Sequence, residues 1–142
     1  MRKFKAATAV LAILVVLALA MLLRDPLLWR EIASREGEGL HLSPSVYYVP
    51  AIHAAIVLVL GIFALRGSKV SVGLLTALMA WYCRGAYLSA VRWSMRGPLE
   101  HEFAVWDQWA ALIYLLLAVS FAIYLVVTLV RAKRPAASSS GT

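Results

Sequence analysis

An arginine lies in the middle of a long apolar segment, in the stretch MAWYCRGAYLSAVRW at residues 79 to 93. The guanidinium of Arg84 stays charged at physiological pH. Placing an arginine at the centre of a membrane helix costs at least about 2.5 kcal/mol. A charge in such a place indicates an ion pair, a bound anion or a proton pathway, so the chemistry of this chain begins with the question of what Arg84 binds.

Four other residues are candidates to join Arg84 in one polar cluster: His53, Tyr87, Asp107 and Tyr114. By helical rise, Arg84 lies about 12 Å below the outer end of its segment, and Asp107 about 5 Å below the outer end of the last one. A long arginine side chain spans most of that gap. The sequence therefore predicts an Arg84–Asp107 ion pair, open to water from the outer side. Two interpretations remain: a structural or snorkelling arginine, and a site for a substrate or a proton.

These residues require membrane-spanning helices to position them. The chain has 142 residues, of which 63% are hydrophobic, well above the roughly 45–50% of soluble domains. Four apolar segments, near residues 6 to 23, 46 to 65, 70 to 91 and 104 to 130, are long enough to cross a hydrocarbon layer of about 30 Å. We expect an all-α integral membrane protein, an antiparallel four-transmembrane-helix bundle formed by a single domain over residues 1 to 134.

The charged residues predict an orientation. Lysine and arginine flank the start of the first segment, the turn at residues 66 to 69 and the end of the fourth segment, while all seven acidic residues fall in or beside the other two connections. Because cytoplasmic flanks of membrane helices are enriched in Lys and Arg, both termini are predicted to be cytoplasmic, in a bacterial-type inner membrane. The first segment also fits a cleaved signal peptide, but it is longer than a usual signal core and a retained helix is favoured.

Helical periodicity predicts which faces pack. On the third segment, small residues share a direction with Arg84, which favours that face as the protein contact: Gly73, Ala77, Ala80, Arg84, Tyr87 and Val91. Leu75, Leu78, Met79 and Tyr82 fall on the far side. On the fourth segment the predicted inner face is Asp107, Ala111, Tyr114, Ala118 and Phe121. On the second it is His53, Val57, Leu60, Gly61 and Ala64.

Between the first two segments, Asp25 as a cap, Pro26 at the first helical position and Gly37 as the stop predict a short outer helix in the membrane interface. Aromatic residues near the outer boundary are predicted to be interface anchors: Trp29, Trp93, Trp106 and Trp109. The polar segment at residues 135 to 142 is expected to be a disordered cytoplasmic tail.

Several function classes are disfavoured. The net charge of +7 is spread over short flanks, so no nucleic-acid partner is expected. One cysteine, Cys83, permits no intramolecular disulfide. A haem held by His53 and His101 is disfavoured because His101 lies in a loop. A metal site at residues 100 to 102 with His41 is disfavoured because adjacent residues do not converge on one ion. No catalytic motif is recognisable, so neither a cofactor nor a metal is predicted and an enzyme is not favoured.

The favoured function is that of a noncatalytic subunit, assembly factor or partner-binding protein of a membrane complex, because the extramembrane segments are too small for a soluble active site. Its partners would be the bilayer and another membrane protein, or copies of itself. The alternative is a small oligomeric transporter, or a lipid- or anion-binding protein, with an outward-facing pocket around Arg84. A haem- or quinone-binding redox protein is a third class.

Overall fold

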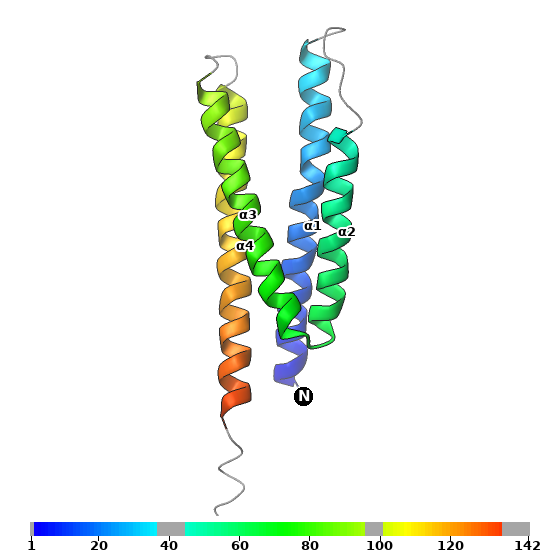
Figure 1. Cartoon of the computed structure of the whole chain (residues 1–142), viewed down its shortest axis with the longest axis vertical. Coiled ribbons are helices and arrows are strands. Elements are labelled where there is room, and N and C mark those ends of the chain that lie inside the picture. Colours follow the sequence, from blue (N-terminus) through cyan, green and yellow to red (C-terminus); the bar gives the residue numbers. More distant parts are fainter. Residues whose placement is uncertain (1, 37–44, 96–100, 135–142) are drawn as a thin grey trace, which may run out of the picture. The chain divides into compact units, whose positions relative to one another are not determined.

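The computed structural model describes the backbone of residues 2–36, 45–95 and 101–134, and the side chains of residues 5–24, 48–95 and 104–134. Four α-helices make up these ranges (Figure 1): α1, Arg2–Glu36; α2, Ser45–Leu65; α3, Lys69–Ser94; and α4, His101–Lys133. The all-helical prediction is confirmed, and the helices contain all four predicted apolar segments. The predicted tail at residues 135 to 142 lies outside the described residues.

The chain divides into two compact units, Met1–Ser68 and Lys69–Thr142. Each unit is an antiparallel helical hairpin, in which α1 packs on α2 and α3 packs on α4 (Figure 1). Each hairpin is described here by itself. The prediction that all four helices form a single domain and bundle stays a prediction.

Three of the helical segments are long and apolar enough to cross a membrane: Lys5–Arg24, Tyr48–Leu65 and Ala104–Lys133. They coincide closely with three of the predicted spans. α3 has sufficient length, but Arg84 and polar residues such as Ser71 and Thr76 lower its hydropathy. The predicted span at residues 70 to 91 is therefore confirmed as a helix, and its membrane crossing stays a prediction.

α1 continues without interruption from Arg2 to Glu36. The prediction of a separate short helix that begins at Asp25 and Pro26 is wrong, since helical backbone passes through both residues. A proline removes one hydrogen bond from a helix interior, and here the helix on both sides of it stays continuous. The predicted stop at Gly37 lies outside the described residues and stays a prediction.

In the first hairpin, α1 and α2 meet along a narrow stripe of small and branched residues. The buried side chains on α1 recur at spacings of four and three residues and belong to Leu11, Val15, Ala18 and Leu22. Those on α2 are Val57 and Ala64, with Gly61 buried between them. A Cβ added to Gly61 would lie 2.6 Å from Cγ1 of Val15, so a glycine is needed for this close approach. The predicted inner face of α2 is confirmed.

In the second hairpin, a heptad-like seam joins α3 to α4. The α4 side repeats at alternating spacings of three and four and consists of Ala104, Asp107, Ala111, Tyr114, Ala118 and Phe121, all of them buried. The α3 side includes Val72, Leu75, Met79 and Ala90, which are buried as well. We call these two sets, with Tyr82 and Ser89 between them on α3, the α3–α4 seam. Such spacing lets the side chains of antiparallel helices interdigitate.

The seam confirms the face predicted for α4 and corrects the one predicted for α3. Leu75 and Met79, which were predicted to point away from the protein, are fully buried against α4, whereas Arg84 and Ala80 are exposed. Leu75 and Met79 fill space between the two helices, whereas Ala77 and Ala80, which share a face with Arg84, lie outside the contact.

A Schellman motif ends α2. The N–H of Ser68 donates to the carbonyl of Phe63 at 3.0 Å, and the N–H of Gly67 donates to that of Ala64 at 3.0 Å. Gly67 has a positive φ of 99°, a conformation that side chains with a Cβ adopt at a cost. The three residues from Arg66 to Ser68 thereby separate the two hairpins.

Candidate functional site

A buried carboxylate links the two helices of the second hairpin. Asp107 lies one turn inside the apolar segment Ala104–Lys133 and is only 6% exposed. Its Oδ2 accepts a hydrogen bond of 2.6 Å from the Oγ of Ser89 on α3. Hydrogen bonds to a carboxylate are short and strong, particularly where water is scarce. This bond therefore fixes the register of α3 relative to α4 near the start of α4.

A pair of tyrosines forms the next polar layer of the seam. The ring centroids of Tyr82 and Tyr114 are 5.5 Å apart and the rings are tilted by 50°, a favourable aromatic arrangement. Tyr82 comes two turns before Ser89 on α3, and Tyr114 comes two turns after Asp107 on α4. Both contacts therefore fit the same antiparallel register. Tyr82, Ser89, Asp107 and Tyr114 are called the seam cluster below.

Arg84 lies outside the seam cluster. Its side chain is exposed, and its guanidinium carbon lies 5.9 Å from the ring centroid of Trp81, one turn earlier on the same helix. At about 100° per residue, Arg84 is displaced by about 140° around α3 from Ser89, the residue that binds Asp107. The hairpin thus places the two charges on different faces, a geometry that does not favour the predicted Arg84–Asp107 ion pair.

The other members of the predicted cluster are also distributed. Tyr114 shares the seam with Asp107, whereas Tyr87 is 61% exposed on α3. His53 is half-buried on α2 and belongs to the first hairpin. Asp107 and Tyr114 therefore lie on one face of α4, two turns apart, and the five-residue cluster stays a prediction. Ser89 and Tyr82 were missed, although their seven-residue spacing matches that of Asp107 and Tyr114.

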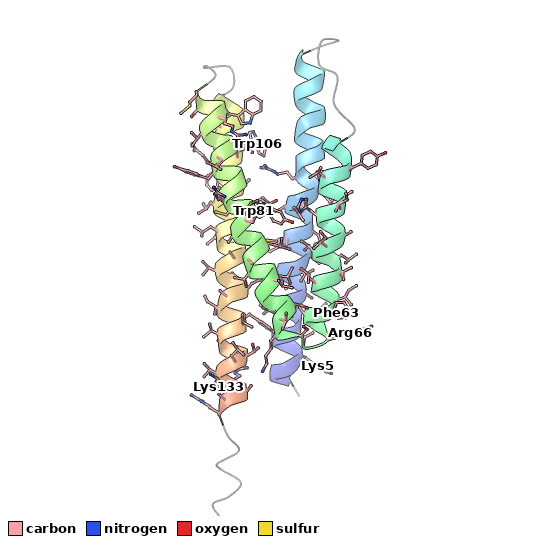
Figure 2. The ribbon with its side chains drawn as sticks, in the orientation of Figure 1. Lys5, Phe63, Arg66, Trp81, Trp106 and Lys133 are labelled. Carbon is pink, nitrogen blue, oxygen red and sulfur yellow. The ribbon has the colours of Figure 1, made fainter. Side chains whose placement is uncertain are left out.

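The predicted interface anchors lie near one end of the second hairpin. Trp106 and Trp109 are exposed near the start of α4, and Trp93 is half-buried near the end of α3 (Figure 2). The side chain of Trp29 lies outside the described residues. Next to Trp109 is a shallow depression of about 270 Å³ lined by Gln108, Trp109 and Leu112, which is too open to enclose a ligand.

Basic side chains occupy the opposite end of that hairpin. Lys133 is exposed at the end of α4 (Figure 2), as are Arg131 and Arg134, and Lys69 is exposed at the start of α3. In the first hairpin, the exposed Lys5 and Arg66 likewise share one end (Figure 2). Each hairpin therefore has one positively charged end, as is typical of the cytoplasmic side of membrane proteins.

Candidate metal ligands do not gather in the part of the chain that the structure describes. No group of three or more His, Cys, Asp or Glu side chains in it could hold a metal ion. The side chains of His41, Glu100, His101 and Glu102, on which the metal and haem alternatives depend, lie outside the described residues.

Removing the Ser89 hydroxyl tests the contribution of the seam cluster. We expect Ser89→Ala to destabilise the full-length protein by about 1 kcal/mol, as for interhelical hydrogen bonds in membrane proteins, because it deprives a buried carboxylate of a donor. Circular dichroism during detergent titration would measure the unfolding free energy. The matched control is Ser94→Ala, whose hydroxyl donates only to the carbonyl of Val91 within α3, at 2.7 Å. Equal effects of the two substitutions would contradict a stabilising role for the Ser89–Asp107 bond.

Comparison with known proteins gives no relative from which a function could be transferred. The chain matches no protein family model, no curated protein and no solved structure. Function must therefore be argued from its own residues.

Proposed function

We propose that this chain is a multi-pass membrane protein that acts without catalysis, as a subunit, assembly factor or partner-binding protein of a membrane complex. The observation that carries the proposal is the position of Arg84, which is exposed in the middle of α3 on the side opposite α4. Charged residues within membrane helices almost always face protein or water, since lipid does not solvate them. A surface of this kind is suited to contact with another protein.

The arrangement of the hairpins is consistent with such a role. Within each hairpin one stripe of each helix makes the contact, and large apolar side chains cover the remaining faces, as expected for helices in contact with lipid or with other membrane helices. The depression beside Trp109 is shallow and open, so it would not shield a reaction from water. Binding through helix faces is the function that these features support best.

The proposed location is a bacterial-type cytoplasmic membrane, with both termini in the cytoplasm. The basic ends of the hairpins support this orientation. Trp106 and Trp109, near the other end of α4, support a membrane interface at that level, since tryptophan is enriched at both interfaces. The basic ends would also attract anionic headgroups, at about 1 kcal/mol per residue near the surface.

A second candidate is a small oligomeric transporter or anion-binding protein. The exposed guanidinium beside Trp81 favours it, because such a group can hold an anionic ligand. The separation of Arg84 from Asp107 on the hairpin argues against a proton-coupled pocket formed by both residues. We therefore place this function second.

Purification of the full-length protein in gentle detergent at native expression level would distinguish the candidates. We expect a protein partner of fixed stoichiometry that co-elutes reproducibly and is identified by mass spectrometry, with no visible absorption band. The control is the same preparation from cells that express an unrelated tagged membrane protein of similar size. A lone oligomer carrying a small anion or lipid would favour the transporter instead, and a haem absorption band would favour the redox class.

A further inference from the structure

α3 has a second regular face, on the side away from the seam. Its members again alternate at spacings of four and three residues and are all exposed: Val70, Leu74, Ala77, Trp81, Arg84 and Leu88. We call this set the outer face of α3. It has the heptad spacing with which a helix binds another helix, and it carries one positive charge.

The register of the seam gives the depth of that charge. The Tyr82–Tyr114 ring contact and the Ser89–Asp107 hydrogen bond place Arg84 level with Leu112 on α4. Leu112 is about six residues, or about 10 Å of helical rise, from the centre of the apolar segment Ala104–Lys133. Because half of a hydrocarbon layer is about 15 Å thick, the backbone of Arg84 lies within that layer when the segment is centred in it.

The direction of the side chain keeps the charge at this depth. Side chains on a helix lean toward its N-terminus, and for α3 this direction points away from the nearer membrane surface, toward Lys69. The guanidinium follows this direction, since its carbon lies 5.9 Å from the ring centroid of Trp81, one turn deeper. Trp81 thereby opposes snorkelling to the nearer headgroups.

The chain's own apolar segments offer almost no counter-charge. Lys5–Arg24 and Tyr48–Leu65 contain neither Asp nor Glu, and α3 contains none. The one carboxylate in Ala104–Lys133 is Asp107, which is buried in the seam and bonded to Ser89. A second copy of the chain presents the same set, so self-association supplies no exposed carboxylate from these segments.

We infer that the outer face of α3 binds a transmembrane helix of a different membrane protein, which carries an Asp or Glu at the depth of Arg84. The guanidinium pairs with that carboxylate, Trp81 holds the guanidinium in position, and Val70, Leu74, Ala77 and Leu88 pack along the partner helix. The inference rests on the proposed function and adds the chemistry of the partner.

A synthetic helix serves as the probe of this chemistry. The full-length protein, with a fluorescent donor at its C-terminal end, is reconstituted in phosphatidylcholine vesicles with an acceptor-labelled leucine-rich helix of about 22 residues. Three such helices differ at one central position, which is Glu, Gln or Leu. Energy transfer as a function of the helix-to-lipid ratio measures their association.

We expect the Glu helix to bind the unaltered protein at least about tenfold more tightly than the Leu helix, because breaking a desolvated charge pair costs at least this much. The preference should vanish in Arg84→Gln and persist in part in Arg84→Lys, which keeps the charge. Arg92→Gln, which removes an exposed charge near the end of α3, is the matched control and should retain the full preference. Circular dichroism would establish that each variant is helical, and the Arg84→Lys result keeps the test valid if Arg84→Gln is misfolded.

Equal binding of the three helices, or a preference unchanged by Arg84→Gln, would overturn the inference. It would also be overturned if phosphatidylglycerol abolished the preference and was itself retained by the unaltered protein but not by Arg84→Gln, since the occupant would then be a lipid phosphate. A co-purifying partner that is insensitive to Arg84→Gln would uphold the proposed function and refute this inference alone. Absence of any partner, with the Glu preference intact, would refute the proposed function alone.

Discussion

Phe121→Ala is expected to destabilise the α3–α4 hairpin by about 3 kcal/mol, at the lower end of the range for large buried aromatic residues. Phe121 is 0% exposed and lies in the seam with the fully buried Leu75 and Met79. In lipid, association of helices depends on close packing rather than on exclusion of water, so the cavity and the lost contacts account for the cost. Unfolding by detergent titration, followed by energy transfer between labels on α3 and α4, would measure it.

Leu116→Ala is the control for this substitution. It removes a large apolar side chain from the same helix at a position that is 58% exposed, and we expect a change within about 0.5 kcal/mol. The labels can be attached through introduced cysteines after Cys83, the single cysteine of the chain, has been replaced by serine. If Leu116→Ala were as destabilising as Phe121→Ala, the seam would not be the face on which α3 and α4 associate.

Gly61→Ala is expected to destabilise the α1–α2 hairpin by about 2 kcal/mol, a typical cost of overpacking. The added Cβ would lie 2.6 Å from Cγ1 and 3.1 Å from Cγ2 of Val15, so either the valine rotates or the helices separate. Val15 is itself buried, which leaves its side chain little space to move. Energy transfer between labels on α1 and α2 during the same titration would give the unfolding free energy.

Two controls identify the clash as the cause. Gly85→Ala introduces the same methyl group into α3, where a Cβ meets no atom within 4 Å, and it should be neutral or stabilising because alanine favours helix over glycine. Combining Gly61→Ala with Val15→Ala removes the clashing methyl groups and should restore part of the lost stability. A double variant no more stable than Gly61→Ala alone would show that the Val15 contact is not responsible.

Periodicity predicted two of the three helix faces correctly. On α4, Asp107, Tyr114 and Phe121 were predicted to share the inner face, and the structure buries all three. On α4 the small and the large inward residues lie on the same face. The preference for small residues at helix contacts and the heptad spacing of larger residues therefore predict the same face. The face of α2 that contains Gly61 was predicted for the same reason.

On α3 the two rules conflict. Small residues favour the face that contains Ala77, Ala80 and Arg84, whereas the heptad of larger residues through Leu75 and Met79 favours the opposite face. Preference for small residues gave the wrong answer for the contact with α4, because the seam of this hairpin is filled by large side chains opposite small ones on α4, such as Ala118. Only the pairing of helices decides which rule holds, and a single segment does not contain that information.

The sequence identified charged residues of the candidate site but did not predict which side chains lie next to each other. Arg84 and Asp107 were identified because charges in apolar segments are rare, but their pairing was inferred from depth alone. The angle of about 140° between Arg84 and Ser89 follows from their separation of five residues on α3. It argues against the pairing because Ser89 marks the side of α3 that α4 occupies. The separate helix after Asp25 was predicted from capping signals, which the continuous α1 overrides.

The division of the chain after Ser68 has a consequence for synthesis of the protein by the ribosome. α1 and α2, which pack on each other, both precede this residue, so both helices of the first hairpin are synthesised before α3 is translated. α3 must instead wait for α4, and until then the side chains of its seam have no helix to pack against. The two hairpins therefore form one after the other during synthesis, the first while α3 is still inside the ribosome.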